Sequence, residues 1–182
     1  MASVRRLIHM TSQLSHAHSD VPRAELANPA ITVRFMLAGD AYVTFQSRRT
    51  GTRFTYRVKA GKPRPGDTRP PPHFVSVLTG PDHYEYLGCV YERKAYSHGR
   101  KSRVDQSAPS AIAFVWVWRT ISGGDMHPEL AVYHEGRCGM CGRRLTTPES
   151  IETGLGPICA KRTGPSRSSN ATYDDDEYGK PF

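Results

Sequence analysis

Residues 41–58 read AYVTFQSRRTGTRFTYRV, and this stretch decides the fold because it has the pattern of two paired strands. From Tyr42 to Ser47 two sets of side chains alternate, and each set points to its own face of an extended strand. One set is Tyr42, Thr44 and Gln46, and the other is Val43, Phe45 and Ser47. Thr50 and Gly51 stand where such a strand has to turn back. The stretch therefore predicts an antiparallel hairpin.

Outward from this hairpin, the sequence predicts a second one. Residues 74–80 (FVSVLTG) and 84–93 (YEYLGCVYER) are again rich in β-branched and aromatic residues, and Gly80-Pro81-Asp82 supplies a turn between them. Residues 60–73 contain five prolines and two glycines, which predicts an exposed loop. Residues 31–37 (ITVRFML) share the β-rich composition, whereas residues 1–30 lack periodicity and predict a flexible arm.

The segment SAPSAIAFVWVWRTISGG, residues 107–124, fits two patterns. Its aromatic residues alternate as in a strand, but Phe114, Trp118 and Ile121 also fall at helical spacing. Pro109 suits the first turn of a helix and Gly123 its end. We favour a helix near residues 108–121, with its tryptophans in the core.

Three of the four cysteines are grouped near the C-terminal end. Cys138 and Cys141 form a C-x2-C knuckle, and Cys159 follows after a segment that predicts a short helix ending at Gly154. In a reducing compartment such a group indicates a metal site, and structural zinc takes four thiolate or imidazole ligands. We favour His134 as the fourth ligand, with Cys89 and His127 as competitors. Three unligated cysteines are the remaining alternative.

These residues also carry a resemblance. The pattern C-x2-C-G-R-x-L-T-x-P-x-S-I-x-x-G-x-G-P-x-C-A, within residues 134–162, resembles a short zinc-binding domain of unknown function found in proteins of phages and actinomycete-type bacteria. The resemblance implies a zinc module and a phage or mobile-element origin, and it brings no activity with it.

Together these elements predict an α+β fold. It consists of a small antiparallel sheet of two or more hairpins, one main helix, a C-terminal zinc module and a disordered acidic tail. We expect four parts: a flexible arm (1–30), a β-rich basic domain (31–126), a zinc-binding module (127–163), and a linker with an acidic tip (164–182).

The charge of the chain indicates a polyanionic partner. The formal net charge is +8, although residues 164–182 hold four acidic and only two basic residues, so the rest of the chain is strongly basic. Nucleic acid is the first candidate and an anionic membrane surface the second. No apolar run approaches the roughly 18 residues of a membrane span, and we expect a soluble, cytoplasmic protein without membrane association.

Two stretches combine cations with aromatic rings, residues 45–57 and residues 91–103. Single-stranded nucleic acid needs cations for its phosphates and flat side chains for its unstacked bases. The alternative is a solvated hairpin and loop whose rings face the core. The residues predicted to bind nucleic acid are Arg48, Arg49, Arg53, Phe54, Tyr56, Arg57, Arg93, Lys94, Tyr96, Arg100, Lys101 and Arg103.

The last twelve residues, ATYDDDEYGKPF, resemble the C-terminal tip of bacterial single-stranded DNA-binding proteins, where an acidic run leads to a terminal Pro-Phe. The resemblance implies recruitment of host replication or repair proteins. The sequence departs from the family because Tyr178, Gly179 and Lys180 separate the acidic run from Pro181. The residues expected to bind the partner are Asp174, Asp175, Asp176, Glu177, Pro181 and Phe182.

The sequence therefore predicts a phage-encoded protein that coats single-stranded DNA and recruits partners through its tail. The acidic residues of the body are scattered and nucleotide-binding or hydrolase motifs are absent, so we expect no enzyme. Two alternatives stay open: an inhibitor or adaptor acting on a host protein through the tail, and a zinc-containing regulator that binds duplex DNA. Oligomerisation is compatible with each of them.

Overall fold

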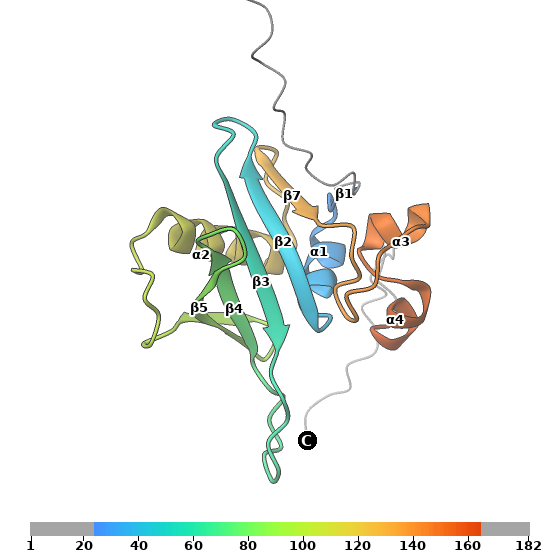
Figure 1. The fold of residues 1–182 in the computed structure, drawn as a ribbon, viewed down its shortest axis with the longest axis horizontal. Coiled ribbons are helices and arrows are strands. Elements are labelled where there is room, and N and C mark those ends of the chain that lie inside the picture. The colour runs from blue at the N-terminus through green and yellow to red at the C-terminus, as the bar shows by residue number, and fades with distance from the viewer. Residues whose placement is uncertain (1–23, 165–182) are drawn as a thin grey trace, which may run out of the picture.

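The computed structural model describes residues 24–164 (Figure 1). The acidic Pro-Phe tip and most of the expected N-terminal arm lie outside these residues. The end of that arm is part of the fold, because Ala24 and Glu25 form the first strand.

Seven strands form one antiparallel sheet in the order β1-β7-β2-β3-β4-β5-β6 (Figure 1). Both predicted hairpins are confirmed: β2 pairs with β3 through a turn at Gly51, and β4 pairs with β5. The strands are β1 (Ala24–Glu25), β2 (Asp40–Ser47), β3 (Arg53–Ala60), β4 (His73–Leu78), β5 (Tyr84–Tyr91), β6 (Ala95–His98) and β7 (Leu130–His134).

The helices are α1 (Pro29–Met36), α2 (Pro109–Ser122), α3 (Pro148–Thr153) and α4 (Pro157–Arg162). The main helix predicted near residues 108–121 is confirmed as α2, which crosses behind the strands in Figure 1. The β-rich interpretation of residues 31–37 is wrong, because residues 29–36 are helical. Asn28 caps this helix by accepting a hydrogen bond from the Ile31 N–H (3.1 Å), and Pro29 occupies its first turn.

One face of the sheet is covered by α1 and α2, and the core lies between these two layers. Alternate residues of the central strands, such as Val43 and Val58, pack there against Phe114 and Trp118 of α2. The buried polar atoms of this layer have partners: the Trp118 indole N–H donates to the Lys94 carbonyl (2.8 Å). Among the helices of residues 24–164, none covers the opposite face of the sheet, which we call the open face.

The expected boundary at residue 127 does not separate two bodies, because β7 lies inside the main sheet between β1 and β2. The chain leaves the sheet after His134 and builds a small module with α3 and α4, around a second cluster that includes Leu145 and Leu155. The α+β fold expected from the sequence is thus confirmed. Among the described residues, no helix combines the length and the apolar character needed to span a bilayer.

Candidate metal centre and open sheet face

The three grouped cysteines meet in the small module. Their sulfur atoms all lie within 4.8 Å of one another, with Cys138 and Cys159 buried and Cys141 exposed. Two sulfurs bound tetrahedrally to one zinc ion are about 3.8 Å apart, since each Zn–S bond is about 2.3 Å long. The spacing of the thiols therefore fits a metal ion after a small contraction.

Local backbone structure holds these thiols. The Cys138 N–H donates to the Arg143 carbonyl (2.8 Å), and the Gly142 N–H donates back to the Cys138 carbonyl (2.9 Å). Gly142 has a φ of +70°, which a side chain would strain, so this glycine permits the tight knuckle. Cys159 comes from the first turn of α4, on the other side of the cluster.

The surroundings of the cluster shift the pKa values of two of its thiols in opposite directions. Burial, and then the hydrogen bonds with the neighbouring thiols of Cys141 and Cys138, raise the pKa of Cys159 to about 12. At Cys138 burial also raises the pKa, but hydrogen bonds from the backbone N–H groups of Gly156, Cys141 and Met140 outweigh it and the pKa is lowered. Three adjacent thiolates need a positive ion, and a bound metal supplies it while releasing the protons.

The predicted fourth ligand, His134, lies outside this cluster, and its assignment is wrong in this structure. Its ring is buried, its Nε2–H donates to the Ile151 carbonyl (2.6 Å), and its Nδ1 accepts a hydrogen bond from the Gly136 N–H (3.0 Å). Burial lowers its pKa although the Ile151 hydrogen bond opposes this, which agrees with a neutral ring. His134 thus ties the module to β7.

The two competing ligands also lie elsewhere. Cys89 is buried in β5, where its sulfur is 3.2 Å from the Tyr86 hydroxyl oxygen, and His127 is exposed beside Trp116, with ring centroids 5.4 Å apart. Within residues 24–164, the residues that form the metal-binding cluster are the three cysteines alone. They could hold the ion, with a fourth donor still to be supplied.

In the first predicted nucleic-acid stretch, most of the arginines are already paired. Arg48 forms an ion pair with Glu25, and Arg49 lies 3.4 Å from a carboxylate oxygen of Glu129. Arg57 donates two hydrogen bonds to Asp40 (2.7 and 2.6 Å) and lies over the Tyr42 ring, 5.2 Å from its centroid. Arg53 is exposed and takes part in no ion pair within residues 24–164.

The predicted base-stacking role of three aromatic residues is wrong, because their rings face the core. Tyr56 is completely buried, and its hydroxyl donates to the Ser110 carbonyl (2.6 Å). Phe54 and Tyr96 are partly buried and pack against the same core. Alternation alone predicts that β3 has two faces, and the sequence does not tell which face the helices cover.

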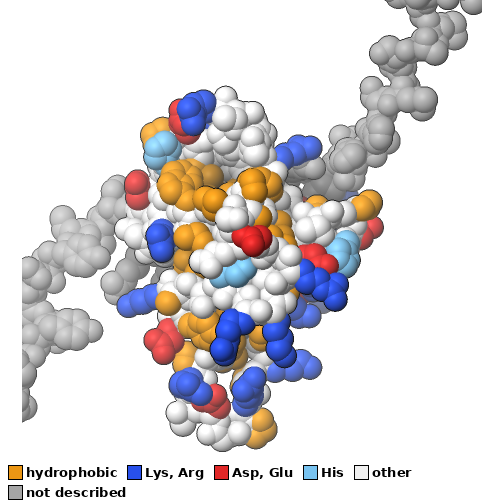
Figure 2. Space-filling model, turned by 90° about the vertical axis from the view of Figure 1, so that its left-hand side faces the viewer, with side chains coloured by type: hydrophobic (Ala, Val, Ile, Leu, Met, Phe, Trp, Pro, Cys, Tyr) orange, Lys and Arg blue, Asp and Glu red, His pale blue; other side chains and the backbone are white. Residues whose placement is uncertain are grey.

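The cations of the second stretch are exposed, whereas its Tyr96 packs against the core. Arg93 and Lys94 lie at the β5–β6 turn, and Arg100 and Lys101 follow β6, all with exposed side chains. Arg103 is exposed too, although one of its nitrogens lies 3.9 Å from a carboxylate oxygen of Glu85. In Figure 2, which views the side of the molecule that is on the left in Figure 1, Lys and Arg side chains gather over the lower half.

The open face gathers aromatic residues that the sequence reasoning missed. Residues paired across an antiparallel ladder point to the same face, and Phe74 pairs with Lys59, while Tyr42 pairs with Arg57. Phe74 is 44% exposed and Tyr91 is 48% exposed. The sequence does contain a signal for this face, because its residues are those that alternate with the buried valines along each strand. The aromatic residues of this face are Tyr42, Phe74, Tyr84, Tyr86, Tyr91 and Tyr133.

These rings form neighbouring pairs. The Tyr42 and Tyr84 rings lie 5.7 Å apart edge to face, and the Phe74 and Tyr86 rings are 6.4 Å apart. Burial, followed by the nearby Glu135 carboxylate, raises the pKa of Tyr84 to about 12, so its hydroxyl is uncharged at neutral pH. The open face therefore presents neutral rings beside the cations Arg53, Arg57 and Lys59.

Comparisons with known proteins address only one part of the chain. No curated protein and no solved structure matches it. Residues 128–164, which comprise β7 and the small module with α3 and α4 (the metal module), match the model of a family of unknown function (DUF6011).

Proposed function

We propose that this protein binds single-stranded nucleic acid on the open face of its sheet, and that a structural zinc ion holds its C-terminal module. The observation that supports the proposal is the group of rings on the open face, of which Phe74 and Tyr91 are exposed, beside the exposed cations Arg53 and Lys59. Unstacked bases gain about 1 to 3 kcal/mol each from stacking on aromatic side chains, while cations meet the phosphates.

The shape of this surface favours a single strand over a duplex. Recognition of duplex DNA in the major groove uses a helix or a two-stranded ribbon that presents its side chains there. The exposed side of α2 carries the apolar residues Ile112 and Trp116, and a broad sheet face does not enter a groove. Exposed cations at the edge of the sheet, Arg93 and Arg100 among them, extend the path for a phosphate backbone.

Further assignments belong to the same proposal. The cysteine cluster is the support for zinc, since soft thiolates in a tetrahedral site suit this metal. We propose a phage or mobile-element origin, a binding role without enzymatic activity, and action in the cytoplasm of a bacterial host. The C-terminal tip would recruit replication or repair proteins, for which the support is its acidic run and terminal Pro-Phe.

The test is fluorescence anisotropy with a labelled strand of about 30 nucleotides, compared with the same sequence as a duplex. We expect preference for the single strand. Replacing the two most exposed rings of the open face, Phe74→Ala with Tyr91→Ala, should weaken binding by about tenfold or more. The matched control is Ile112→Ala with Trp116→Ala, which removes two exposed apolar side chains from α2 and should leave the affinity unchanged.

Two outcomes would contradict the proposal. One is equal affinity for the strand and the duplex. The other is an equal loss of affinity in the α2 control, which would place the contact surface outside the open face.

A further inference from the structure

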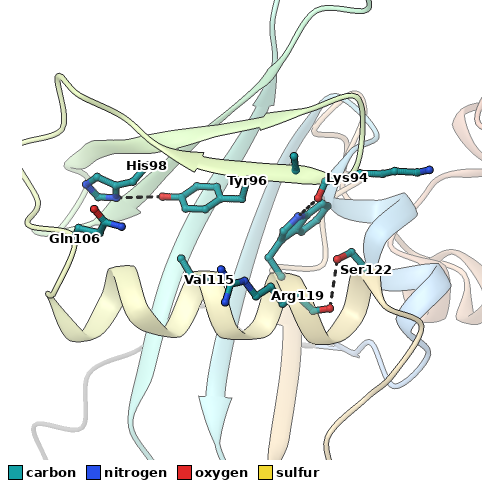
Figure 3. A pocket seen from close by; sticks show the side chains of 9 residues that line it. Lys94, Tyr96, His98, Gln106, Val115, Arg119 and Ser122 are labelled. Carbon is teal, nitrogen blue, oxygen red and sulfur yellow. Dashed lines mark hydrogen bonds between the residues drawn. The ribbon is translucent and has the colours of Figure 1, made fainter.

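A second candidate site lies between β6 and α2, on the helix-covered side of the sheet (Figure 3). It is a pocket of about 290 Å³, which is near the lower end of the range for small-molecule sites, about 300 to 1,000 Å³. Its polar lining comes from three parts of the chain: β6 and its preceding turn, the loop before α2, and the exposed side of α2. The polar lining residues are Lys94, Tyr96, His98, Gln106, Arg119 and Ser122.

The pocket is positively charged. Arg119 supplies this charge, because the Lys94 side chain points away from the pocket in Figure 3, and none of the lining residues is acidic. Arg119 takes part in no ion pair within residues 24–164. In Figure 3 the Arg119 side chain extends from α2 into the space between the helix and β6. A guanidinium in this position can form paired hydrogen bonds with a phosphate.

The nearest carboxylate in sequence does not neutralise this charge directly. Asp105 precedes the lining residue Gln106, but it accepts hydrogen bonds from the Ser107 N–H (2.7 Å) and the Ser107 hydroxyl (2.6 Å). These hydrogen bonds hold the Asp105 carboxylate in the loop, and they lower its pKa. The Arg119 guanidinium therefore remains available to an anion from solution.

The far end of the pocket is polar and preorganised. The His98 Nε2–H donates to the Val104 carbonyl (3.0 Å), and the Tyr96 hydroxyl lies 3.4 Å from His98 Nδ1 and 3.4 Å from the Leu87 carbonyl, to which it donates. Both side chains are thereby oriented, as Figure 3 shows, and the Gln106 amide lies beside them. An amide offers both a donor and an acceptor, which suits a sugar hydroxyl or the edge of a base.

We infer that this pocket binds a phosphate monoester, carried either by a free mononucleotide or by the terminal phosphate of a nucleic-acid strand. Arg119 holds the phosphate through paired hydrogen bonds, and Gln106 contacts the attached sugar or base. The site is separate from the open face, since its residues lie on the side of the sheet that faces α2. The inference therefore stands independently of the proposed binding of single strands.

Isothermal titration calorimetry of the full chain with dTMP tests this inference. We expect one molecule of dTMP per chain and at least about tenfold weaker binding of thymidine, which lacks the phosphate. Arg119→Gln should weaken dTMP binding at least about tenfold. The control Arg64→Gln makes the same charge change on the exposed β3–β4 loop and should have no effect.

A conservative variant tests the geometry. Arg119→Lys keeps the charge but loses the paired donors, so its affinity for dTMP should fall between those of the wild type and the Arg119→Gln variant. The two sources of the ligand are distinguished by comparing nucleic-acid strands that end in a 5′-phosphate with strands that end in a 5′-hydroxyl. Equal binding of thymidine and dTMP, an equal loss in the loop control, or no binding of dTMP would each overturn the inference. Loss of single-strand binding in the Phe74 and Tyr91 variant would not affect it.

Discussion

The thiols of the cysteine cluster differ in the protonation state that their surroundings favour. Cys138 is surrounded by backbone N–H donors that stabilise a thiolate, whereas burial and the adjacent thiols raise the pKa of Cys159 to about 12. Without a cation Cys159 therefore stays protonated at neutral pH. A metal ion reverses this preference, because its positive charge stabilises a coordinated thiolate.

This residue-level difference gives a prediction for metal content. Cys159→Ser removes a thiolate ligand, so the bound metal should fall from about one ion per chain to a small fraction of that value. Cys89→Ser is the matched control, because Cys89 is equally hidden from solvent but lies outside the cluster. Elemental analysis of the purified proteins measures both. Cys159→His restores a ligand and should recover the metal, and a metal-bearing, folded Cys159→Ser protein would contradict the prediction.

His134 shows that spacing along the chain does not by itself identify a metal ligand. It lies four residues before Cys138, close enough to be a ligand, and the sequence alone favours it. The structure uses both of its ring nitrogens in hydrogen bonds to Gly136 and Ile151 instead. The cysteine triad could be predicted because its pattern is local, whereas the role of His134 depends on how the module packs against β7.

At the scale of elements, the β5–β6 hairpin contains an unusual turn. Glu92 and Arg93 have φ values of +48° and +61°, and the Lys94 N–H donates to the Tyr91 carbonyl (2.9 Å). Two successive residues with positive φ form the kind of tight turn for which Asn-Gly is preferred. Side chains with a Cβ cost about 1 to 2 kcal/mol per residue in this conformation. The hairpin thus presents Arg93 and Lys94 at the expense of stability.

Relieving this strain should stabilise the fold. Glu92→Asn with Arg93→Gly is expected to increase the free energy of unfolding by about 1 to 2 kcal/mol, as measured by urea denaturation. Arg93→Lys keeps both the Cβ and the charge, so it should leave stability unchanged. An unchanged or lower stability of the double variant would show that the turn is not strained.

The elements predicted correctly from the sequence are those whose signals are local. The two hairpins follow from alternation and turn residues, and α2 follows from spacing bounded by Pro109 and Gly123. The β-rich composition of residues 31–37 misleads because Ile31, Thr32 and Val33 favour strands, whereas burial of Phe35 and Met36 against the sheet stabilises the helix. The open face could not be predicted from local signals, because it is defined by which side of the sheet the helices cover.

At the scale of the whole molecule, the metal module is packed directly onto the body through Phe35 of α1. A Cβ atom on Gly154 would lie 2.4 Å from this ring, and one on Gly139 would lie 2.8 Å from it, so both positions require glycine for the close approach. Arg34 adds a hydrogen bond from its side chain to the Ala160 carbonyl (2.7 Å). These close contacts couple the stability of the module to that of the sheet.

The last prediction follows from this coupling. Both tryptophans, Trp116 and Trp118, lie in α2, so their fluorescence reports unfolding of the body and not of the module. Because metal bound only to the folded state stabilises every part that unfolds with it, a strong chelator should lower the unfolding midpoint seen by tryptophan fluorescence by about 5 °C or more. The chelator should not shift the midpoint of Cys159→Ser, which lacks the metal from the start. An unchanged wild-type midpoint after verified removal of the metal would mean that the module unfolds on its own, and the packing around Phe35 would then not make the two parts one cooperative unit.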